Sequence, residues 1–328
     1  MELRQLRYFV RIVELGSVSR AAKALFIAQP ALSAQIANLE TELGVRLLTR
    51  SVRGVTATVA GESLYLHAHA VLRQIERLCH DVSTSGSTPG GPVSLGIPTS
   101  AANILAGPLI AAVQERYPDI QLRIVESLSG HLQEMVVNGR LEMSLLFEPG
   151  GTPSTSTLRD STSVGHLNWL PLLDEELFLL SEPKNGVIES APISLEEAAQ
   201  LRLVLPGRSN ITRQLIDQAF TTAGLQAHVV AEIDSLSTIQ SIVESGHAAT
   251  ILSLSAFVGP DIRTKLSVRS LGGGTLSRRL SLCTSDIMGL GAAAESLVTL
   301  IPALVHAFVE SGKWAGASII QDESVGQL

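Results

Sequence analysis

The chain has 328 residues, of which 45% are hydrophobic and 17% are charged. This length is enough for two or three domains with a sizeable core, and the composition excludes a disordered chain. Cys79 and Cys283 are too few for a disulfide framework, and no N-terminal stretch has the pattern of a signal peptide. We therefore expect a cytoplasmic protein. Glu295 and Pro302 interrupt the longest weakly polar run, 288–308, so we expect no membrane span there.

The net charge of −7 is unevenly distributed along the chain. Residues 1–58 contain eight Lys or Arg and four Glu, a balance of +4, so the remaining residues carry −11. A small basic region joined to a larger acidic body is typical of a polyanion-binding module attached to a second domain. Charge alone leaves the simpler alternative open, since a surface imbalance of this size also arises by chance.

The N-terminal stretch predicts three helices. Apolar residues recur at helical spacing from Leu3 to Val13, and Gly16 is a suitable end for that first helix. Ser17 is a suitable N-cap for a short second helix, and Pro30 fits the first turn of a third, amphipathic helix. A short helix, a tight connection and a second amphipathic helix form the pattern of a helix-turn-helix.

The third helix has an unusual exposed face. Leu32, Ile36 and Leu39 form an apolar stripe, whereas the opposite face is nearly uncharged. Small side chains allow a helix to approach base edges in a DNA major groove, where Gln and Ser form hydrogen bonds and Ala or Pro meets a thymine methyl group. The alternative is an all-α domain in which alanine permits close packing. The face comprises Pro30, Ala31, Ala34 and Ala37, flanked by Gln29, Ser33, Gln35 and Asn38.

The segment after this helix favours a wing. Gly44 marks a turn, and Arg50 and Arg53 stand around a short loop that ends at Gly54. Thr56 follows on the far side of the loop. Arginines in such a loop are suited to phosphate groups or to a narrow minor groove.

A long helix follows the wing, with Thr58 as a suitable N-cap. Its apolar residues are spaced 4, 3, 4, 3, 4, which is a heptad seam. A helix of this kind most simply pairs with a second copy of itself, which places two DNA-reading helices on two half-sites. The alternative is that the seam packs on the chain's own N-terminal region. The seam residues are Leu64, Ala68, Val71, Ile75, Leu78 and Val82.

The remainder of the chain predicts an α/β body. Gly, Ser, Thr and Pro fill residues 83–92 almost entirely, which indicates a hinge. Strands and helices then alternate, as in a parallel sheet covered by helices. We expect the polar tail from Gly312 to be loosely held. The predicted strands are 93–98, 120–127, 142–148, 177–181, 203–205, 229–232, 249–252 and 279–283, and the predicted helices are 99–118, one ending at 138, 213–223, 237–245 and 292–311.

Thr99 and Ser100 directly follow the first of these strands and begin a helix. Ligands of open parallel sheets bind beyond the carboxyl ends of the strands. Free N–H groups and two hydroxyl groups at this point suit a carboxylate or another small anion. The alternative is an ordinary Ser/Thr N-cap.

Residues 1–66 resemble the N-terminal domain of LysR-type transcriptional regulators, through FVRIVELGSVSRAAKALFIAQPALSAQIANLETELGVRLLTRSVRGVTATVAGE. The match covers the whole winged helix-turn-helix without a gap. IAQPALS and RGVTAT also resemble the nitrogen assimilation control subgroup of that family. The resemblance implies DNA contacts from Gln29, Pro30, Ser33 and Ala34, with Gln35 beside them on the same helix, and from Arg50, Arg53 and Thr56 in the wing.

The segment from 93 to about 310 resembles the effector-binding domain of the same family, which has two subdomains like those of periplasmic solute-binding proteins. The resulting division is a winged helix-turn-helix (1–58), a dimerisation helix (59–85), a hinge (86–92), an effector-binding domain (93–311) and a tail (312–328). Subdomain I takes about 93–166 and 268–311, and subdomain II about 167–267. The resemblance implies a cleft lined by Thr99, Ser100, Ser129, Phe147, Arg208 and Thr250.

These features predict a transcriptional regulator that binds double-stranded promoter DNA as a homodimer or homotetramer. One Arg and two hydroxyl groups in the cleft favour a small anionic effector, and RNA polymerase is a further candidate partner. An effector-independent regulator with a vestigial cleft stays open as the alternative.

An enzyme or a solute-binding protein is the least favoured interpretation of the body. The sequence has no Gly-x-Ser-x-Gly elbow, no P-loop and no His-Glu-x-x-His, so we predict no catalytic residue and no cofactor. His67 and His69 point to different faces of a helix, so we predict no metal site there. A solute-binding protein would also need a secretion signal.

Overall fold

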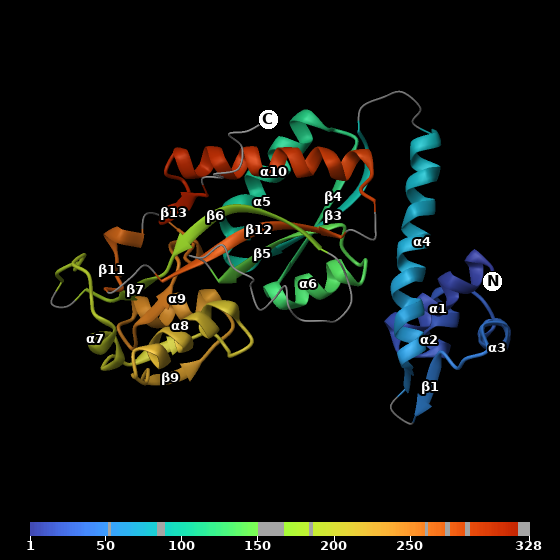
Figure 1. Ribbon diagram of the computed structural model, residues 1–328, viewed down its shortest axis with the longest axis horizontal. Coiled ribbons are helices and arrows are strands. Elements are labelled where there is room, and N and C mark those ends of the chain that lie inside the picture. Colours follow the sequence, from blue (N-terminus) through green and yellow to red (C-terminus); the bar gives the residue numbers. More distant parts are fainter. Residues whose placement is uncertain are drawn as a thin grey trace. The chain divides into compact units, whose positions relative to one another are not determined.

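The computed structural model describes residues 1–51, 54–83, 89–149, 167–183, 186–259, 262–272, 276–285 and 289–320. The chain forms two compact units that meet in sequence at Gly91 and Pro92 (Figure 1). Each unit has its own buried apolar core.

The N-terminal unit consists of three helices, a two-stranded wing and a long helix. Ser17 Oγ accepts a hydrogen bond from the N–H of Arg20 at 3.3 Å, and Thr58 Oγ1 accepts one from the N–H of Gly61 at 3.0 Å. Both predicted N-caps are therefore confirmed. The elements are α1 (Leu3–Leu15), α2 (Val18–Ala24), α3 (Gln29–Leu43), β1 (Leu48–Ser51), β2 (Gly54–Ala57) and α4 (Val59–Ser83).

The apolar stripe of α3 holds this helix in the core of the unit. Leu32, Ile36 and Leu39 are buried in one cluster with Phe9 of α1. Removal of these side chains from water fixes the rotation of α3 about its axis. The opposite face of the helix is consequently left to solvent.

Backbone contacts fix the wing and the start of α4. The N–H of Val55 donates to the Gly16 carbonyl at 2.9 Å, which ties β2 to the turn before α2. Glu40 near the end of α3 accepts a hydrogen bond from the N–H of Leu47 at 2.7 Å. Gly61 of α4 comes so close to this segment that a Cβ atom would lie 2.0 Å from the Leu47 carbonyl oxygen. Only glycine fits at this crossing.

The seam predicted on α4 is partly used within the chain. Ala68 is buried against Leu6 and Val10 of α1, so at this position the alternative of packing on the chain's own head is correct. Val71 and Leu78 are 42% and 61% exposed, which leaves this part of the seam open. Of the other seam residues, Leu64 and Ile75 are half-buried, and the side chain of Val82 lies outside the described part.

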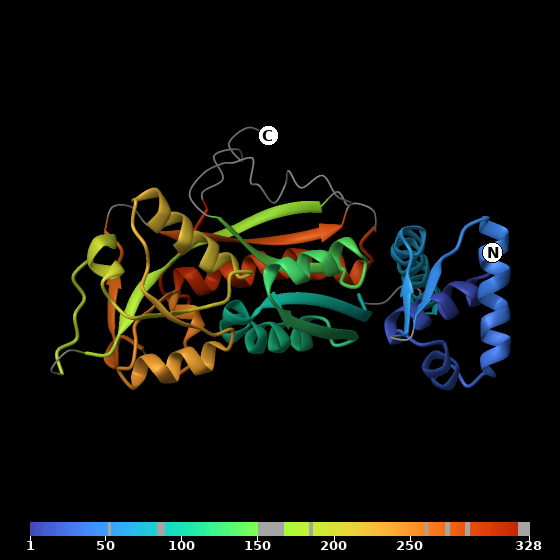
Figure 2. The ribbon, with the colours of Figure 1, turned by 90° about the horizontal axis from the view of Figure 1, so that it is seen from below.

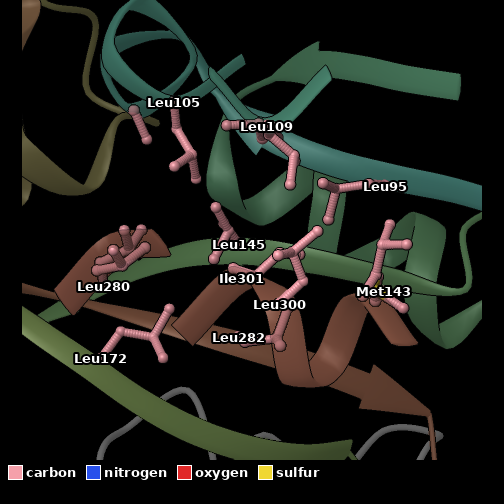
Figure 3. Close-up of a cluster of buried hydrophobic side chains, with 14 of the residues drawn as sticks. Leu95, Leu105, Leu109, Met143, Leu145, Leu172, Leu280, Leu282, Leu300 and Ile301 are labelled. Atoms are coloured by element: carbon pink, nitrogen blue, oxygen red, sulfur yellow. The ribbon is translucent and has the colours of Figure 1, made fainter. Parts of the chain in front are cut away.

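A six-stranded sheet forms the centre of subdomain I, in the order β13-β6-β12-β5-β3-β4. One face packs on α5 and α10, where Leu105 and Ile301 meet Leu145 and Leu280 (Figure 3). The other face packs on α6 through Leu132. The elements are β3 (Gly91–Pro98), α5 (Thr99–Arg116), β4 (Ile120–Ser127), α6 (Ser129–Val137), β5 (Met143–Pro149), β6 (Leu167–Glu176), β12 (Ser277–Ser285), α10 (Ala292–Glu310) and β13 (Ala317–Ile319).

The helix α10 combines an apolar sequence with a buried position. Among the described residues it is the one helix that is long and apolar enough to cross a membrane. Leu297, Leu300 and Ile301 of this helix pack in the core beneath the sheet. Core packing therefore accounts for its apolar sequence.

The chain between β6 and β12 builds subdomain II. β7 pairs antiparallel with β10 and β11, β8 pairs parallel with β9, and a bridge between Leu203 and Ala249 joins the two sheets. The elements are β7 (Phe178–Ser181), α7 (Leu195–Ala199), β8 (Leu203–Leu205), α8 (Ile211–Thr222), β9 (Val229–Glu232), α9 (Leu236–Glu244), β10 (Thr250–Leu252), the 3₁₀ turns η1 (Leu254–Ala256) and η2 (Ile262–Thr264), and β11 (Ser267–Ser270).

The expectation of a parallel sheet is wrong for half of subdomain I. β3 and β5 are parallel, but β12 runs antiparallel to both β5 and β6. The chain leaves subdomain I along β6 and returns along β12, and two such connecting strands must point in opposite directions. β6 was not predicted as a strand, because Pro171 interrupts its pattern; the ladder with β12 shifts register there, between Leu280 and Ser281.

The expectation of a loosely held tail from Gly312 is wrong for its described part, 312–320. Trp314 is 1% exposed in the core of subdomain I, and β13 pairs with β6 at the edge of the sheet. Both interactions join residues more than a hundred positions apart, so the local polar composition gave no sign of them. Residues 321–328 lie outside the described part.

Candidate nucleic-acid interface and ligand cleft

The predicted groove-reading residues belong to α3, which lies at the edge of the N-terminal unit (Figure 2). Gln29, Pro30 and Ala34 are exposed, and Ser33 and Gln35 are half-buried. The helix thus presents small and amide groups outward while Leu32, Ile36 and Leu39 are buried. This geometry leaves room for the backbone of α3 to approach base edges.

Two glutamines on this helix are positioned by neighbouring helices. Ser19 Oγ of α2 donates to Gln29 Oε1 at 2.7 Å, and Gln5 Nε2 of α1 donates to Gln35 Oε1 at 3.4 Å. In both contacts the glutamine oxygen accepts, so its amide N–H groups stay available as donors. The pair at Gln29 is exposed, and the pair at Gln35 is partly buried.

The wing contributes Thr56 and the backbone of Arg50. Thr56 is exposed on β2, opposite Thr49 of β1, and Arg50 pairs with Val55. The side chain of Arg50 and the whole of Arg53 lie outside the described residues. The role predicted for the two arginines stays a prediction.

The second candidate site is a cleft between the two subdomains. Four of the six residues that the resemblance implied line it together with Arg278 of β12: Thr99, Ser100, Ser129 and Phe147. From subdomain II, the start of α8 faces these residues. The volume of the cleft is about 50 Å³, far below the roughly 300–1,000 Å³ of typical ligand pockets.

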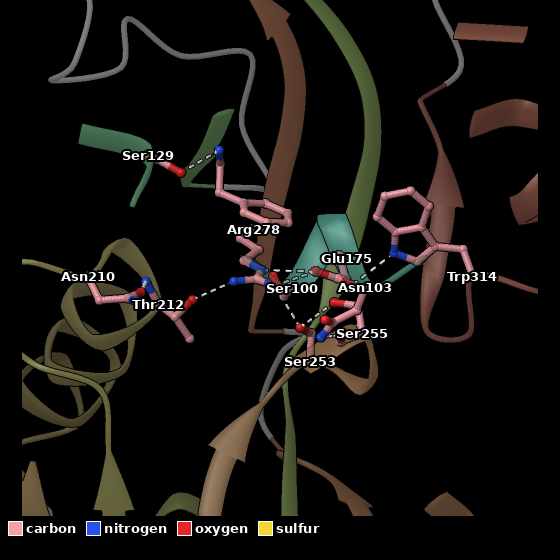
Figure 4. Close-up of polar contacts among 11 residues, drawn as sticks. Ser100, Asn103, Ser129, Glu175, Asn210, Thr212, Ser253, Ser255, Arg278 and Trp314 are labelled. Carbon is pink, nitrogen blue, oxygen red and sulfur yellow. Dashed lines mark hydrogen bonds and ion pairs between the residues drawn. The ribbon is translucent and has the colours of Figure 1, made fainter. Parts of the chain in front are cut away.

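Arg278 lines this cleft and is hydrogen-bonded to both subdomains (Figure 4). Nη2 donates to Ser100 Oγ of subdomain I and to Ser253 Oγ of subdomain II, and Nη1 donates to Thr212 Oγ1, each at 2.7 Å. The guanidinium also lies 3.6 Å above the centroid of the Phe147 ring. The side chain is almost fully buried.

The charge of Arg278 is balanced by Glu175 of β6. Nε and Nη2 donate to the same carboxylate oxygen at 2.9 and 2.7 Å, and Glu175 is fully buried. Its other oxygen accepts the indole N–H of Trp314 at 2.9 Å (Figure 4). The buried ion pair is therefore hydrogen-bonded at both ends, as a buried pair must be.

Other polar groups of the cleft are also occupied. Ser129 Oγ accepts the N–H of Phe147 at 3.0 Å, and Asn210 Oδ1 caps α8 by accepting the N–H of Thr212 at 2.9 Å.

The N-termini of α5 and α8 both lie at the cleft, where their partial positive charges favour an anion.

Two residues predicted in the cleft do not line it. Arg208 has an 80% exposed side chain and pairs with Glu232 on the surface, at 3.5 Å. Thr250 is fully buried and donates to the Val204 carbonyl at 2.7 Å, because it lies on a strand inside subdomain II. The cleft arginine is instead Arg278.

A sequence signal for Arg278 existed. Alternate residues of a strand share a face, and Arg278 falls on the same face as Leu280 and Leu282, which are in the core. An arginine that continues an apolar face at the end of a strand needs buried partners. The sequence of the strand does not tell which residues those partners are.

Comparisons with known families agree with this geometry. The model for bacterial regulatory helix-turn-helix proteins of the lysR family matches residues 3–62, and the model for the LysR substrate binding domain matches residues 86–304. The chain belongs to the LysR family. It is a DNA-binding transcriptional regulator and not an enzyme, as predicted, and the predicted fold class is confirmed.

Relatives and solved structures extend this assignment. The nitrogen assimilation regulatory protein nac of Klebsiella aerogenes is 37% identical over 257 residues, which are 78% of this chain and 79% of that protein. A full-length OxyR variant from Pseudomonas aeruginosa is 22% identical with a TM-score of 0.69, covering 98% and 99% of the two chains. Full-length CbnR in complex with its target DNA is 20% identical with a TM-score of 0.59, covering 94% and 98%. The two structures share the fold.

Proposed function

We propose that this LysR regulator acts in the cytoplasm and reads promoter DNA with the exposed face of α3. The observation that carries the proposal is the division of that helix into a buried apolar stripe and an uncharged outer face. Gln29 and Ser33 would specify bases, and Arg50, Arg53 and Thr56 would contact the DNA backbone. The complex of CbnR with its target DNA supports this use of the fold.

Gel-shift titrations of the full chain on DNA from its own upstream region test the proposal. We expect salt-sensitive binding, with Arg53→Ala weaker on every sequence and Gln29→Ala or Ser33→Ala altered in site preference, by about 1–3 kcal/mol at one base position. Gln114→Ala, which removes an exposed glutamine on α5 of the other unit, is the matched control. Equal losses of Gln29→Ala on specific and random DNA would contradict the division of roles.

Oligomerisation is part of the proposal. The exposed part of the α4 seam, with Val71 and Leu78, supports pairing with a second copy into a homodimer or homotetramer. Two heads would then occupy two half-sites, and RNA polymerase is a candidate partner of the DNA-bound assembly. Sedimentation of Leu78→Glu tests this step. If the seam joins two copies, a charge at position 78 should weaken the contact, and the variant should sediment with a lower mass than the wild type.

For the cleft, the leading candidate function is the binding of a small anionic effector. Two helix N-termini, Thr99, Ser100 and the guanidinium of Arg278 support an anion there. Binding requires the cleft to open beyond its present volume. Thermal-shift screening of small carboxylates tests this: a stabilisation that Ser100→Ala and Thr99→Val reduce supports the site, and one that persists unchanged in both refutes it.

The second candidate is a regulator that needs no effector. The small cleft volume and the mutual hydrogen bonds of Arg278, Glu175 and Thr212 favour it, since the chain's own groups occupy the positions that a ligand would use. Promoter footprints with and without the carboxylate set decide between the two. An unchanged footprint throughout supports the effector-independent candidate.

A further inference from the structure

Phe26 lies in the turn between α2 and α3 with its ring in solvent. The residue is 96% exposed, more than any other large hydrophobic residue in the described part of the chain. Leu25 and Ile27, on either side of it, pack against the core of the N-terminal unit. A single exposed apolar residue is ordinary on a protein surface, so exposure alone does not mark a site.

The backbone of Phe26 has the left-handed conformation that favours glycine. Its φ is 55°, and among the described residues no other non-glycine residue has a positive φ. The N–H of Phe26 donates to the Lys23 carbonyl at 3.3 Å, and the N–H of Ile27 donates to the Ala22 carbonyl at 3.0 Å. These two bonds form a Schellman motif, in which the left-handed position is usually glycine.

The two neighbouring helices of the unit end in the expected way. α1 is followed by Gly16 with φ of 58°, and α3 by Gly44 with φ of 69°. Phenylalanine thus replaces glycine only at the helix end that leads into α3. The left-handed conformation is strained for a side chain of this size, and a ring in solvent stabilises nothing in the folded chain. The fold therefore gives no reason for Phe26.

We propose that Phe26 is a DNA-contacting residue whose ring packs on apolar DNA surface beside the groove that α3 enters. The turn lies next to the predicted reading face, because Ser19 of α2 is hydrogen-bonded to Gln29, the first residue of α3. Arg20 and Lys23 of α2 are exposed close by in sequence, and their charge suits a polyanion. The apolar surface is a thymine methyl group or the carbon atoms of a deoxyribose.

Three substitutions separate the ring from the backbone strain. Phe26→Gly removes both, Phe26→Ala removes the ring alone, and Phe26→Trp keeps an aromatic ring. We expect Phe26→Gly and Phe26→Ala to bind a DNA fragment selected by the wild-type chain roughly tenfold more weakly, equivalent to about 1.4 kcal/mol. Phe26→Trp should stay within about threefold of the wild type. Phe26→Gly should also unfold at a higher temperature, because the strain is relieved.

Salt titrations and modified DNA complete the test. An apolar contact releases no counterions, so log K of Phe26→Gly should keep the wild-type dependence on log salt concentration. On the same fragment with uracil in place of thymine, loss of the difference between wild type and Phe26→Gly assigns the ring to a thymine methyl group, and its persistence assigns the ring to deoxyribose.

Three results would overturn the inference: wild-type affinity in Phe26→Gly, a changed salt slope, or a changed oligomer mass in sedimentation, which would place the ring at a contact between copies. The inference rests on the proposed use of α3 as the reading helix. If the wild-type chain selects no DNA, that proposal fails; if it selects DNA but Phe26→Gly binds equally well, only the role of Phe26 fails.

Discussion

The outer face of α3 and the cleft between the subdomains use polar side chains in opposite ways. On α3, Gln29 is exposed and shares one hydrogen bond with a serine of the neighbouring helix. In the cleft, Arg278 makes five hydrogen bonds to four partners and Glu175 is bonded through both carboxylate oxygens. The outer face of α3 therefore has side-chain donors available to another molecule, whereas Arg278 and Glu175 in the cleft are already paired with groups of the chain.

This difference follows from burial. An exposed amide needs no protein partner for its N–H donors, because water accepts hydrogen bonds from them in the free protein at little cost. The same donors can then bond to DNA. A buried guanidinium and a buried carboxylate must be paired within the folded chain itself, since an unpaired charge in the interior costs several kcal/mol. Any effector that enters the cleft must therefore exchange bonds with Arg278, whereas DNA meets α3 with few bonds to break.

The largest change in stability is expected from Arg278→Met. Glu175 would then keep a buried charge without its cation, and we expect the unfolding free energy of the C-terminal unit to fall by about 3–5 kcal/mol. Trp169 and Trp314 both belong to this unit, so urea unfolding followed by tryptophan fluorescence reports on it. The double variant Arg278→Met with Glu175→Gln should recover part of the loss, and no recovery would argue against charge as the cause.

Gly61→Ala tests the N-terminal unit in the same way. The added Cβ atom would lie 2.0 Å from the Leu47 carbonyl oxygen, so α4 or the wing must shift. We expect a loss of about 1–3 kcal/mol of stability in that unit, as for other overpacked sites, and weaker DNA binding. Tryptophan-reported unfolding of the C-terminal unit should not change. Gly107→Ala on α5, where an added Cβ meets nothing within 4 Å, is the control.

The smallest effect is expected at Glu232, whose side chain is 44% exposed and pairs at 3.0 Å with Arg213, a buried arginine that also pairs with Asp217. The hydrogen bond from Arg213 lowers the pKa of Glu232 from its ordinary 4.5. The pair therefore stabilises the fold above this ordinary value, and its contribution is lost as the pH falls through the lowered pKa. The urea midpoint of the wild type should drop more between pH 7 and acid than that of Glu232→Gln. Equal drops would show that this pair does not contribute.

The outer face of α3 could be predicted from the sequence more fully than the cleft. Leu32, Ile36 and Leu39 fix the rotation of α3 within eight residues of sequence, so its outer face was predictable. In the cleft, Thr99 and Ser100 were predictable because they directly follow a strand. The family resemblance implied Arg208 in the cleft. The alternation of β12 points to a buried Arg278, but no local pattern tells which cavity a buried arginine enters.

The sequence by itself determined the helix-turn-helix and the caps at Ser17 and Thr58, because each depends on residues within a few turns of one another. The family and the two-subdomain plan came from the resemblance of whole segments to known regulators. The tertiary structure alone decided the contacts that span the chain. Arg278 meets Ser100 across 178 positions and Trp314 meets Glu175 across 139. Such pairs form only when separate elements are packed together, and no local periodicity encodes them.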